Sequence, residues 1–217
     1  MNNQTVKLVG LTYPTIEGIN NLEEFIAYVA RVSNPANQSN SLTSNKLLKY
    51  LIKNQHWSPF EMAHAVLEIN TTRDIARQIL RHRSFAFQEF SQRYADPTQL
   101  GFSIREARLQ DTKNRQNSID DVEDTIQTWW ADAQQDHNKK AAALYSKALE
   151  AGIAKECARM VLPLSSETKL YMSGTIRSYI HYCQLRCGAA TQKEHRDIAN
   201  SIRDILIKEI PILGELL

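Results

Sequence analysis

Hydrophobic and polar residues alternate near the start of the chain, over the segment from Thr5 to Tyr13. This two-residue period, together with the β-branched residues in the segment, predicts a strand that Pro14 would end. The spacing of apolar residues then changes to that of a helix, which we expect to begin at Asn20 and to run to about Ser33.

Further elements follow in the first half of the chain. Asn20 is followed three residues later by Glu23, a capping-box pattern that predicts Asn20 as the cap of the first helix. A short second helix is predicted over residues 47–52 and a mostly buried strand over residues 65–69. The two threonines after that strand are candidates for capping the next helix.

A long helical pattern runs from Ser118 to Glu150 and would be closed by Gly152. At 1.5 Å per residue it would span roughly 50 Å, so its exposed end would need another subunit to cover it. A shorter helix should end at Pro163.

The last part of the chain is mostly helical in pattern. Residues 169–174 are ambiguous, whereas residues 175–187 predict a helix. Thr191 and Glu194 predict a last capped helix that ends before Pro211. These elements indicate an α+β fold, with helices around a modest sheet.

The composition favours one domain over residues 1–217, since 42% of the residues are hydrophobic. The 26 Lys and Arg exceed the 24 Asp and Glu by only two, which argues against a general nucleic-acid or membrane-surface binder. The three cysteines form no CxxC pair, so neither a disulfide framework nor a metal site is expected. No long apolar run or leader pattern is evident, and we expect a soluble, cytoplasmic protein.

The chemistry-bearing residues begin with an arginine cluster. Arg73, Arg77 and Arg81 recur every four positions, so they would line one helix face and repel one another unless something anionic compensates. Arg83 and Arg93 flank an irregular segment rich in hydroxyl and amide groups. Planar guanidinium groups in this setting suit phosphate and nucleobase edges, although they could instead pair with acidic residues on a solvated face.

The spacing of this cluster resembles a known signature. RHR at 81–83, then seven residues, then Ser91, is similar to the RHR-x7-S motif of the flavin-dependent thymidylate synthases. HWSPFE at 56–61 resembles the H-x-x-PFE loop of that family, and ARVS at 30–33 and ARMVLP at 158–163 also fit. With a later block from Gly174 to Arg186, the resemblance covers roughly residues 5 to 205.

The resemblance implies a role for particular residues. The FAD contacts it implies are Ser58, Arg81, His82, Arg83, Thr175, Ile176, Arg177 and His181, with Ser33, His56 and Glu61 as weaker candidates. The dUMP contacts it implies are Gln78, Ile79, Leu80, Arg81, Glu89, Phe90, Ser91, Gln92, Arg93, Arg159 and Arg186. Arg186 would be the catalytic residue, which holds the uracil ring and favours its ionised form.

The resemblance also implies a reaction and an assembly. NADPH reduces bound FAD, 5,10-methylenetetrahydrofolate gives the carbon, and the reduced flavin gives the hydride that converts dUMP to dTMP, leaving tetrahydrofolate. The implied fold is the ThyX-like α+β fold with a mostly antiparallel sheet, in a homotetramer with active sites at subunit interfaces. No cysteine nucleophile is required, and the lack of a GxGxxG motif indicates that FAD is not held by a Rossmann loop.

Some points stay open at the level of sequence. His82 lies between two arginines, so we expect it to be neutral, whereas Arg159 could be an ordinary surface ion-pair partner. On a regular helix Arg186 lies about 180° from Arg177, so the two either serve different ligands or the helix is distorted near Gln184. The alternatives to an enzyme are a nucleic-acid-binding module and a nucleotide-binding regulator without turnover.

Overall fold

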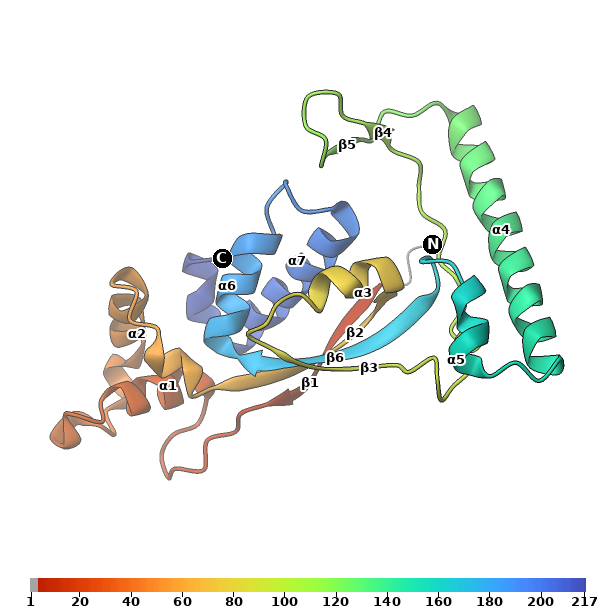
Figure 1. The fold of residues 1–217 in the computed structure, drawn as a ribbon. Coiled ribbons are helices and arrows are strands. Elements are labelled where there is room, and N and C mark those ends of the chain that lie inside the picture. Colours follow the sequence, from red (N-terminus) through yellow and green to blue (C-terminus); the bar gives the residue numbers. More distant parts are fainter. Residues whose placement is uncertain (1–3) are drawn as a thin grey trace. The chain divides into compact units, whose positions relative to one another are not determined.

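The chain forms helices and strands in an α+β arrangement, seen in a computed structural model that describes residues 4–217 (Figure 1). The helices are α1 (Leu22–Ala30), α2 (Ser44–Lys53), α3 (Arg73–Ile79), α4 (Asp124–Glu150), α5 (Lys155–Ala158), α6 (Ile176–Arg186) and α7 (Lys193–Glu209). The strands are β1 (Thr5–Leu11), β2 (His64–Thr72), β3 (Ala86–Glu89), β4 (Leu109–Gln110), β5 (Ser118–Ile119) and β6 (Glu167–Thr175). The predicted fold class is confirmed.

The main sheet has the strand order β1-β2-β6-β3. Thr12, just past the end of β1, donates its N–H to the carbonyl of His64 at the start of β2 (2.9 Å), whereas Asn70 near the end of β2 donates to Thr5 (2.8 Å). This reversal makes the pair antiparallel. Strands β2 and β6 are antiparallel as well, because Arg73, just after β2, donates its N–H to Ser166 (3.0 Å), whereas Ile176, just after β6, donates to Ala63 (2.9 Å). This agrees with the mostly antiparallel sheet that the family resemblance implied. A separate two-stranded antiparallel sheet pairs β4 with β5.

The chain divides into two compact units. The first unit contains Ile69–Arg81 and Gln88–Leu170, with Gln4 and Thr5, and the second contains Val6–Glu68, His82–Phe87 and Tyr171–Leu217. Since the boundaries fall within strands and at the end of the α3 region, each unit combines segments distant in sequence. The expectation of a single domain stays a prediction.

The second unit has an aromatic and aliphatic core. Helix α1 packs on α2, and α6 packs on α7, with Ile26, Leu48, Tyr179 and Tyr182 among the side chains that are fully buried. Burial of whole aromatic side chains contributes most per residue to a core of this kind. Helices α6 and α7 lie side by side in Figure 1.

The first helix is capped one residue later than expected. Asn21, not Asn20, is the cap residue, and its side chain accepts a hydrogen bond from the N–H of Glu24 (2.9 Å). The Glu24 carboxylate in turn accepts the N–H of Asn20 (2.7 Å). The reciprocal pattern of a capping box is present, but two adjacent asparagines made its register ambiguous.

The long helix of the first unit is shorter than predicted. Helix α4 begins at Asp124, because Ser118 and Ile119 pair with β4 instead, and its 27 residues span about 40 Å. Gly152 follows its end with a φ of 81°, as expected for a residue after a helix C-terminus. Within α4 the buried residues are Asn138, Ala141 and Tyr145.

One segment that was ambiguous in the sequence is resolved, and one predicted helix cap is wrong. Residues 169–174 belong to strand β6, in which Thr168, Leu170 and Met172 alternate as buried positions. The last helix is capped by Gln192, and the hydroxyl of Thr191 bonds to the carbonyl of Leu185 (3.4 Å) rather than capping the helix. Among residues 4–217, no helix has the length and apolar content needed to cross a membrane.

Candidate functional site

The arginine cluster of the first unit does not form the continuous stripe that its spacing predicted. Helix α3 ends at Ile79, so Arg81 lies beyond it. Arg73 pairs with Glu89 (2.7 Å), and the hydroxyl of Thr168 donates to the same carboxylate oxygen (2.9 Å). The anionic group that compensates Arg73 is therefore a carboxylate of the chain itself.

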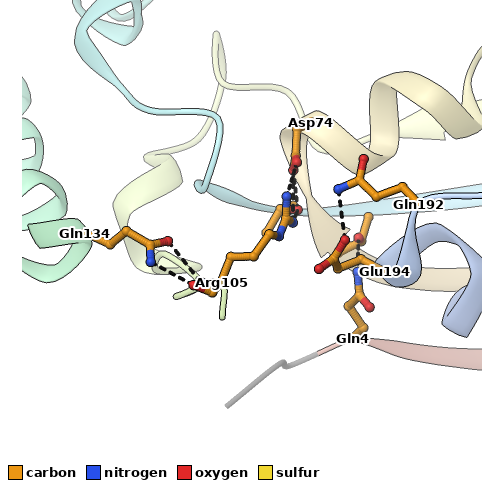
Figure 2. Close-up of polar contacts among 8 residues, drawn as sticks. Gln4, Asp74, Arg105, Gln134, Gln192 and Glu194 are labelled. Atoms are coloured by element: carbon orange, nitrogen blue, oxygen red, sulfur yellow. Dashed lines mark hydrogen bonds and ion pairs between the residues drawn. The ribbon is translucent and has the colours of Figure 1, made fainter. Parts of the chain in front are cut away.

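A second arginine of the first unit is neutralised in the same way. Arg105 forms an ion pair with Asp74 and donates to the hydroxyl of Thr72 (3.2 Å). Its backbone is fixed by Gln134 of α4, which accepts from the Arg105 N–H (3.0 Å) and donates to the Arg105 carbonyl (2.8 Å), as Figure 2 shows. Arg105 was not identified from the sequence, because nothing in its local pattern points to Asp74.

The first unit also carries most of the residues proposed for dUMP. Ile79 and Gln92 are buried, and Arg81 and Arg93 are exposed. Gln78, Leu80, Phe90 and Ser91 are half-buried. Glu89 is already engaged by Arg73, as described above, so its carboxylate has one oxygen committed within the chain.

Two contacts connect the segment after β3 with helix α5 inside the first unit. Arg93 pairs with Glu156 (3.2 Å), and Lys155 donates to the carbonyl of Tyr94 (3.0 Å). Arg159, which is half-buried, follows α5 directly. The structure thus brings the short helix that precedes Arg159 against the Ser91 to Tyr94 segment, two regions about 65 residues apart in sequence.

The second unit carries most of the residues proposed for FAD. Thr175 caps α6, with its hydroxyl accepting from the Ser178 N–H (3.1 Å). The Ile176 side chain is fully buried, and its N–H donates to the carbonyl of Ala63 (2.9 Å). Of this set, Ser58, Arg83, Arg177 and His181 are exposed.

An ion pair joins two of the motifs that the sequence carries far apart. Arg177, in the first turn of α6, pairs with Glu61 of the HWSPFE loop. That loop forms a short 3₁₀ helix, Ser58–Glu61, of which Phe60 is fully buried. The loop and the later block are therefore adjacent within the second unit, although 116 residues separate the two partners.

Arg186 lies at the end of α6 and contacts His82. Its Nε donates to the Nε2 atom of His82 at 2.9 Å. Helix α6 is continuous from Ile176 to Arg186, so the distortion considered near Gln184 is absent. Arg177 and His181 are exposed whereas Arg186 is half-buried, which fits the large angular separation that helical geometry requires.

His82 is neutral in this setting. Its pKa is lowered to about 4, first because the ring is withdrawn from water and then because Arg186 and His181 lie nearby. The neutral form expected from sequence is confirmed, but the cause differs: burial and Arg186 depress the pKa rather than the flanking arginines.

Two residues beside His82 were not found by sequence analysis. The Tyr182 ring meets the His82 ring edge-on, with centroids 4.8 Å apart, and the Tyr182 hydroxyl lies 2.9 Å from Nε2 of His195 in α7. Both are fully buried. Tyr182 lies one helical turn before Arg186, a spacing that could have flagged it, whereas no local signal indicates His195.

Along most of its length the chain is similar in sequence to known proteins. The family profile described as thymidylate synthase complementing protein matches residues 16–212. A probable flavin-dependent thymidylate synthase of Paramecium bursaria Chlorella virus 1 is 55% identical over 213 residues, 98% of each chain. A flavin-dependent thymidylate synthase of Synechocystis sp. is 50% identical, covering 96% of this chain and 97% of the relative.

A solved structure supports the fold alone. The UMP/dUMP methylase PolB from Streptomyces cacaoi, bound with 5-Br dUMP, superposes with a TM-score of 0.84, covering 99% of this chain and 94% of its own. Its sequence is 24% identical. The same arrangement of helices and sheet therefore persists where most side chains differ.

Proposed function

The chain belongs to the thymidylate synthase complementing protein family, the family of flavin-dependent thymidylate synthases, and from this premise we propose that it methylates dUMP to dTMP. The carbon comes from 5,10-methylenetetrahydrofolate and the reducing equivalents come from NADPH. Bound FAD, once reduced, would supply the hydride that completes the methyl group. The observation that carries the proposal is the pairing of Arg186 with a neutral His82, which links the RHR motif to the later block.

The donors of the second unit fit a flavin nucleotide. Arg83 and His181 are exposed, and Arg83 has no ion-pair partner among residues 4–217. Guanidinium groups and a hydroxyl such as that of Ser58 suit the pyrophosphate and the ring carbonyls of FAD. We assign FAD to Ser58, Arg81, His82, Arg83, Thr175, Ile176, Arg177 and His181.

Arg186 is the residue assigned to the uracil ring of dUMP. Its Nε is occupied by His82, while its two terminal nitrogens have no hydrogen-bond partner among residues 4–217. Two parallel N–H groups of this kind match two adjacent acceptors on a planar ring. Placed there, the guanidinium stabilises negative charge that develops on uracil. The other dUMP contacts assigned are Gln78 to Arg81, Glu89 to Arg93 and Arg159.

The assembly we propose is a homotetramer in the cytoplasm, with active sites at subunit interfaces. Helix α4 supports this proposal, because it exposes Trp129 (64%) and Leu144 (52%). Exposed apolar groups on one long helix favour coverage by another subunit. Sedimentation of the purified protein tests the stoichiometry directly.

The visible spectrum of the purified protein tests the function. We expect a yellow protein that releases FAD on denaturation and forms dTMP when dUMP, NADPH and methylenetetrahydrofolate are added. A colourless protein whose melting temperature does not respond to FAD would contradict the proposal and favour a nucleic-acid-binding module. Tight binding of FAD and dUMP without dTMP formation would favour a regulator.

A further inference from the structure

Four side chains of the second unit form a connected cluster. Arg186 bonds to His82 (2.9 Å), the His82 ring packs edge-on against Tyr182, and the Tyr182 hydroxyl bonds to His195 (2.9 Å). The His82 and His195 rings are themselves near each other, with centroids 6.3 Å apart. Three chain segments, the RHR motif, α6 and α7, thereby meet at one point.

The direction of the Arg186 bond fixes the proton of His82. An arginine Nε can only donate, so Nε2 of His82 must be the acceptor and must carry no proton. Neutral His82 then carries its proton on Nδ1. No residue among 4–217 accepts from Nδ1, so that N–H is available to a ligand while Nε2 holds the guanidinium.

This arrangement requires that the His82 ring keep one orientation. Turning the ring over would place a carbon opposite Arg186 Nε and lose the hydrogen bond. The ring is flanked by Tyr182, whose own orientation is set by burial and by the bond to His195. Tyr182 also packs against Phe85, with ring centroids 6.1 Å apart.

The Phe85 ring is confined by strand β6 of the main sheet. A Cβ added to Gly174 of β6 would lie 2.4 Å from a ring carbon of Phe85, so that ring sits directly on the strand backbone. The stack from strand to Phe85 to Tyr182 has little freedom to shift. His82 is therefore held against a rigid aromatic support rather than a mobile one.

We propose that Tyr182 and His195 are positioning residues for the reaction, which hold the His82 ring so that it aims the Arg186 guanidinium at the uracil ring of dUMP. The inference rests on the proposed function, because Arg186 is assigned to dUMP there. It adds α7, through His195, to the elements that determine the rate. In metal sites, replacing a residue that orients a ligand typically costs about 10- to 100-fold in affinity or activity, and we expect an effect at the lower end of that range here.

The test compares two buried tyrosines of the same helix. Tyr182→Phe removes the hydroxyl that bonds to His195, and Tyr179→Phe, the control, removes a hydroxyl that bonds to the carbonyl of Met172 (2.6 Å). His195→Gln keeps a hydrogen-bonding group beside Tyr182, whereas His195→Leu does not. Each variant is measured as holoenzyme for the single-turnover oxidation of reduced flavin with dUMP and methylenetetrahydrofolate.

We expect Tyr182→Phe and His195→Leu to slow this step about tenfold with unchanged FAD affinity, His195→Gln to recover most of the rate, and Tyr179→Phe to match the wild type. A second readout needs no flavin: ¹⁵N spectra of histidine in the apoprotein should show one His82 tautomer in the wild type and a mixture in Tyr182→Phe.

The inference is overturned if Tyr182→Phe and Tyr179→Phe have the same rate and the same His82 spectrum. A wild-type protein that binds no FAD and forms no dTMP would instead refute the proposed function. In that case the His82 spectra still decide whether Tyr182 and His195 orient the ring, so the two failures are distinguishable.

Discussion

Arginines occupy two different environments in this chain. In the first unit, Arg73 faces Glu89 and Arg105 faces Asp74, so each cation is matched by a carboxylate. In the second unit, Arg186 faces His82, which is neutral, and no carboxylate among residues 4–217 lies within ion-pair distance of it. The first arrangement uses its charge to hold segments of the chain together, whereas the second keeps its positive charge available for an anionic ligand.

Disrupting these two arrangements should affect different properties of the protein, stability in the first case and the reaction rate in the second. Removing one partner of a neutralised pair leaves an uncompensated charge and lowers the free energy of unfolding. Removing Arg186 takes away a cation whose neighbours, His82 and His195, have pKa values lowered first by burial and then by Arg186 itself. The folded state should tolerate that loss, and the reaction should not.

The largest effect is expected for Arg186→Lys. Lysine keeps the charge but cannot donate to His82 and contact the uracil ring at two points at once. We expect the single-turnover oxidation of reduced flavin to slow by about 100-fold, with FAD affinity nearly unchanged. Loss of FAD in a normally folded variant would move Arg186 to the flavin site, and an unchanged rate would remove it from the active site.

Asp74→Asn should have the next largest effect, which is a loss of stability. It removes the charge that faces the part-buried Arg105, and we expect the free energy of unfolding to fall by about 2 to 3 kcal/mol. The control is Asp136→Asn, which breaks the exposed pair with Lys140 (2.6 Å) and should cost less than about 0.5 kcal/mol. Urea denaturation measures both, and equal losses would contradict the distinction.

Gly174→Ala tests the support beneath the second arginine environment. The new Cβ would meet the Phe85 ring at 2.4 Å, so the ring must move. We expect a loss of about 1 to 3 kcal/mol in the free energy of unfolding. Gly188→Ala is the matched control, because no atom lies within 4 Å of its added Cβ. A neutral Gly174→Ala would show that Phe85 is not held rigidly.

A smaller effect is expected on how the stability of the protein depends on pH. The pKa values of His82 and His195 are lowered from 6.5 to about 4, chiefly by burial. The unfolded chain therefore binds more protons between these values, so this contribution to stability is complete above pH 6.5 and is lost as pH falls towards 4. Urea denaturation across this pH range should show that the free energy of unfolding falls less steeply with decreasing pH in His195→Gln than in the wild type. If the two proteins lose stability in parallel, the lowered pKa of His195 does not contribute to stability.

The smallest effect is expected for the cysteines. Hydrogen bonding to Cys183 lowers the pKa of the Cys187 thiol to about 7, yet no cysteine is required by the proposed reaction. Replacing Cys157, Cys183 and Cys187 with Ala or Ser should leave dTMP formation largely intact, apart from packing losses at buried Cys183. Abolished turnover with FAD still bound would contradict the flavin mechanism.

Local pattern predicted much of this molecule, and long-range contacts explain most of what it missed. Strand β1 and helix α6 follow directly from their hydrophobic periods. Strand β6 was ambiguous because two of its buried positions are Thr168 and Gly174, which carry little hydrophobic signal. Likewise, the carboxylates that neutralise Arg73 and Arg105 lie 16 and 31 residues away, beyond any helical spacing.

In the candidate site, too, local motifs could be found in the sequence, whereas the contacts between distant segments could not. The RHR segment and the later block were identified through their resemblance to a family, and residues such as His82 and Arg186 were named on that ground. Their mutual hydrogen bond, which spans 104 residues, could not be inferred from either segment alone. His195 has no signature at all, because its significance comes only from the packing of α7 on α6.

The central claim is that Arg105 holds segments of the chain together, whereas Arg186 keeps its positive charge for the ligand. One crossed measurement tests it: the dissociation constant for dUMP and the melting temperature, both determined for Arg186→Gln and for Arg105→Gln. We predict that Arg186→Gln weakens dUMP binding at least tenfold at an unchanged melting temperature, whereas Arg105→Gln lowers the melting temperature and leaves dUMP affinity intact. The reverse pattern, or equal effects of both variants on both quantities, would contradict the account.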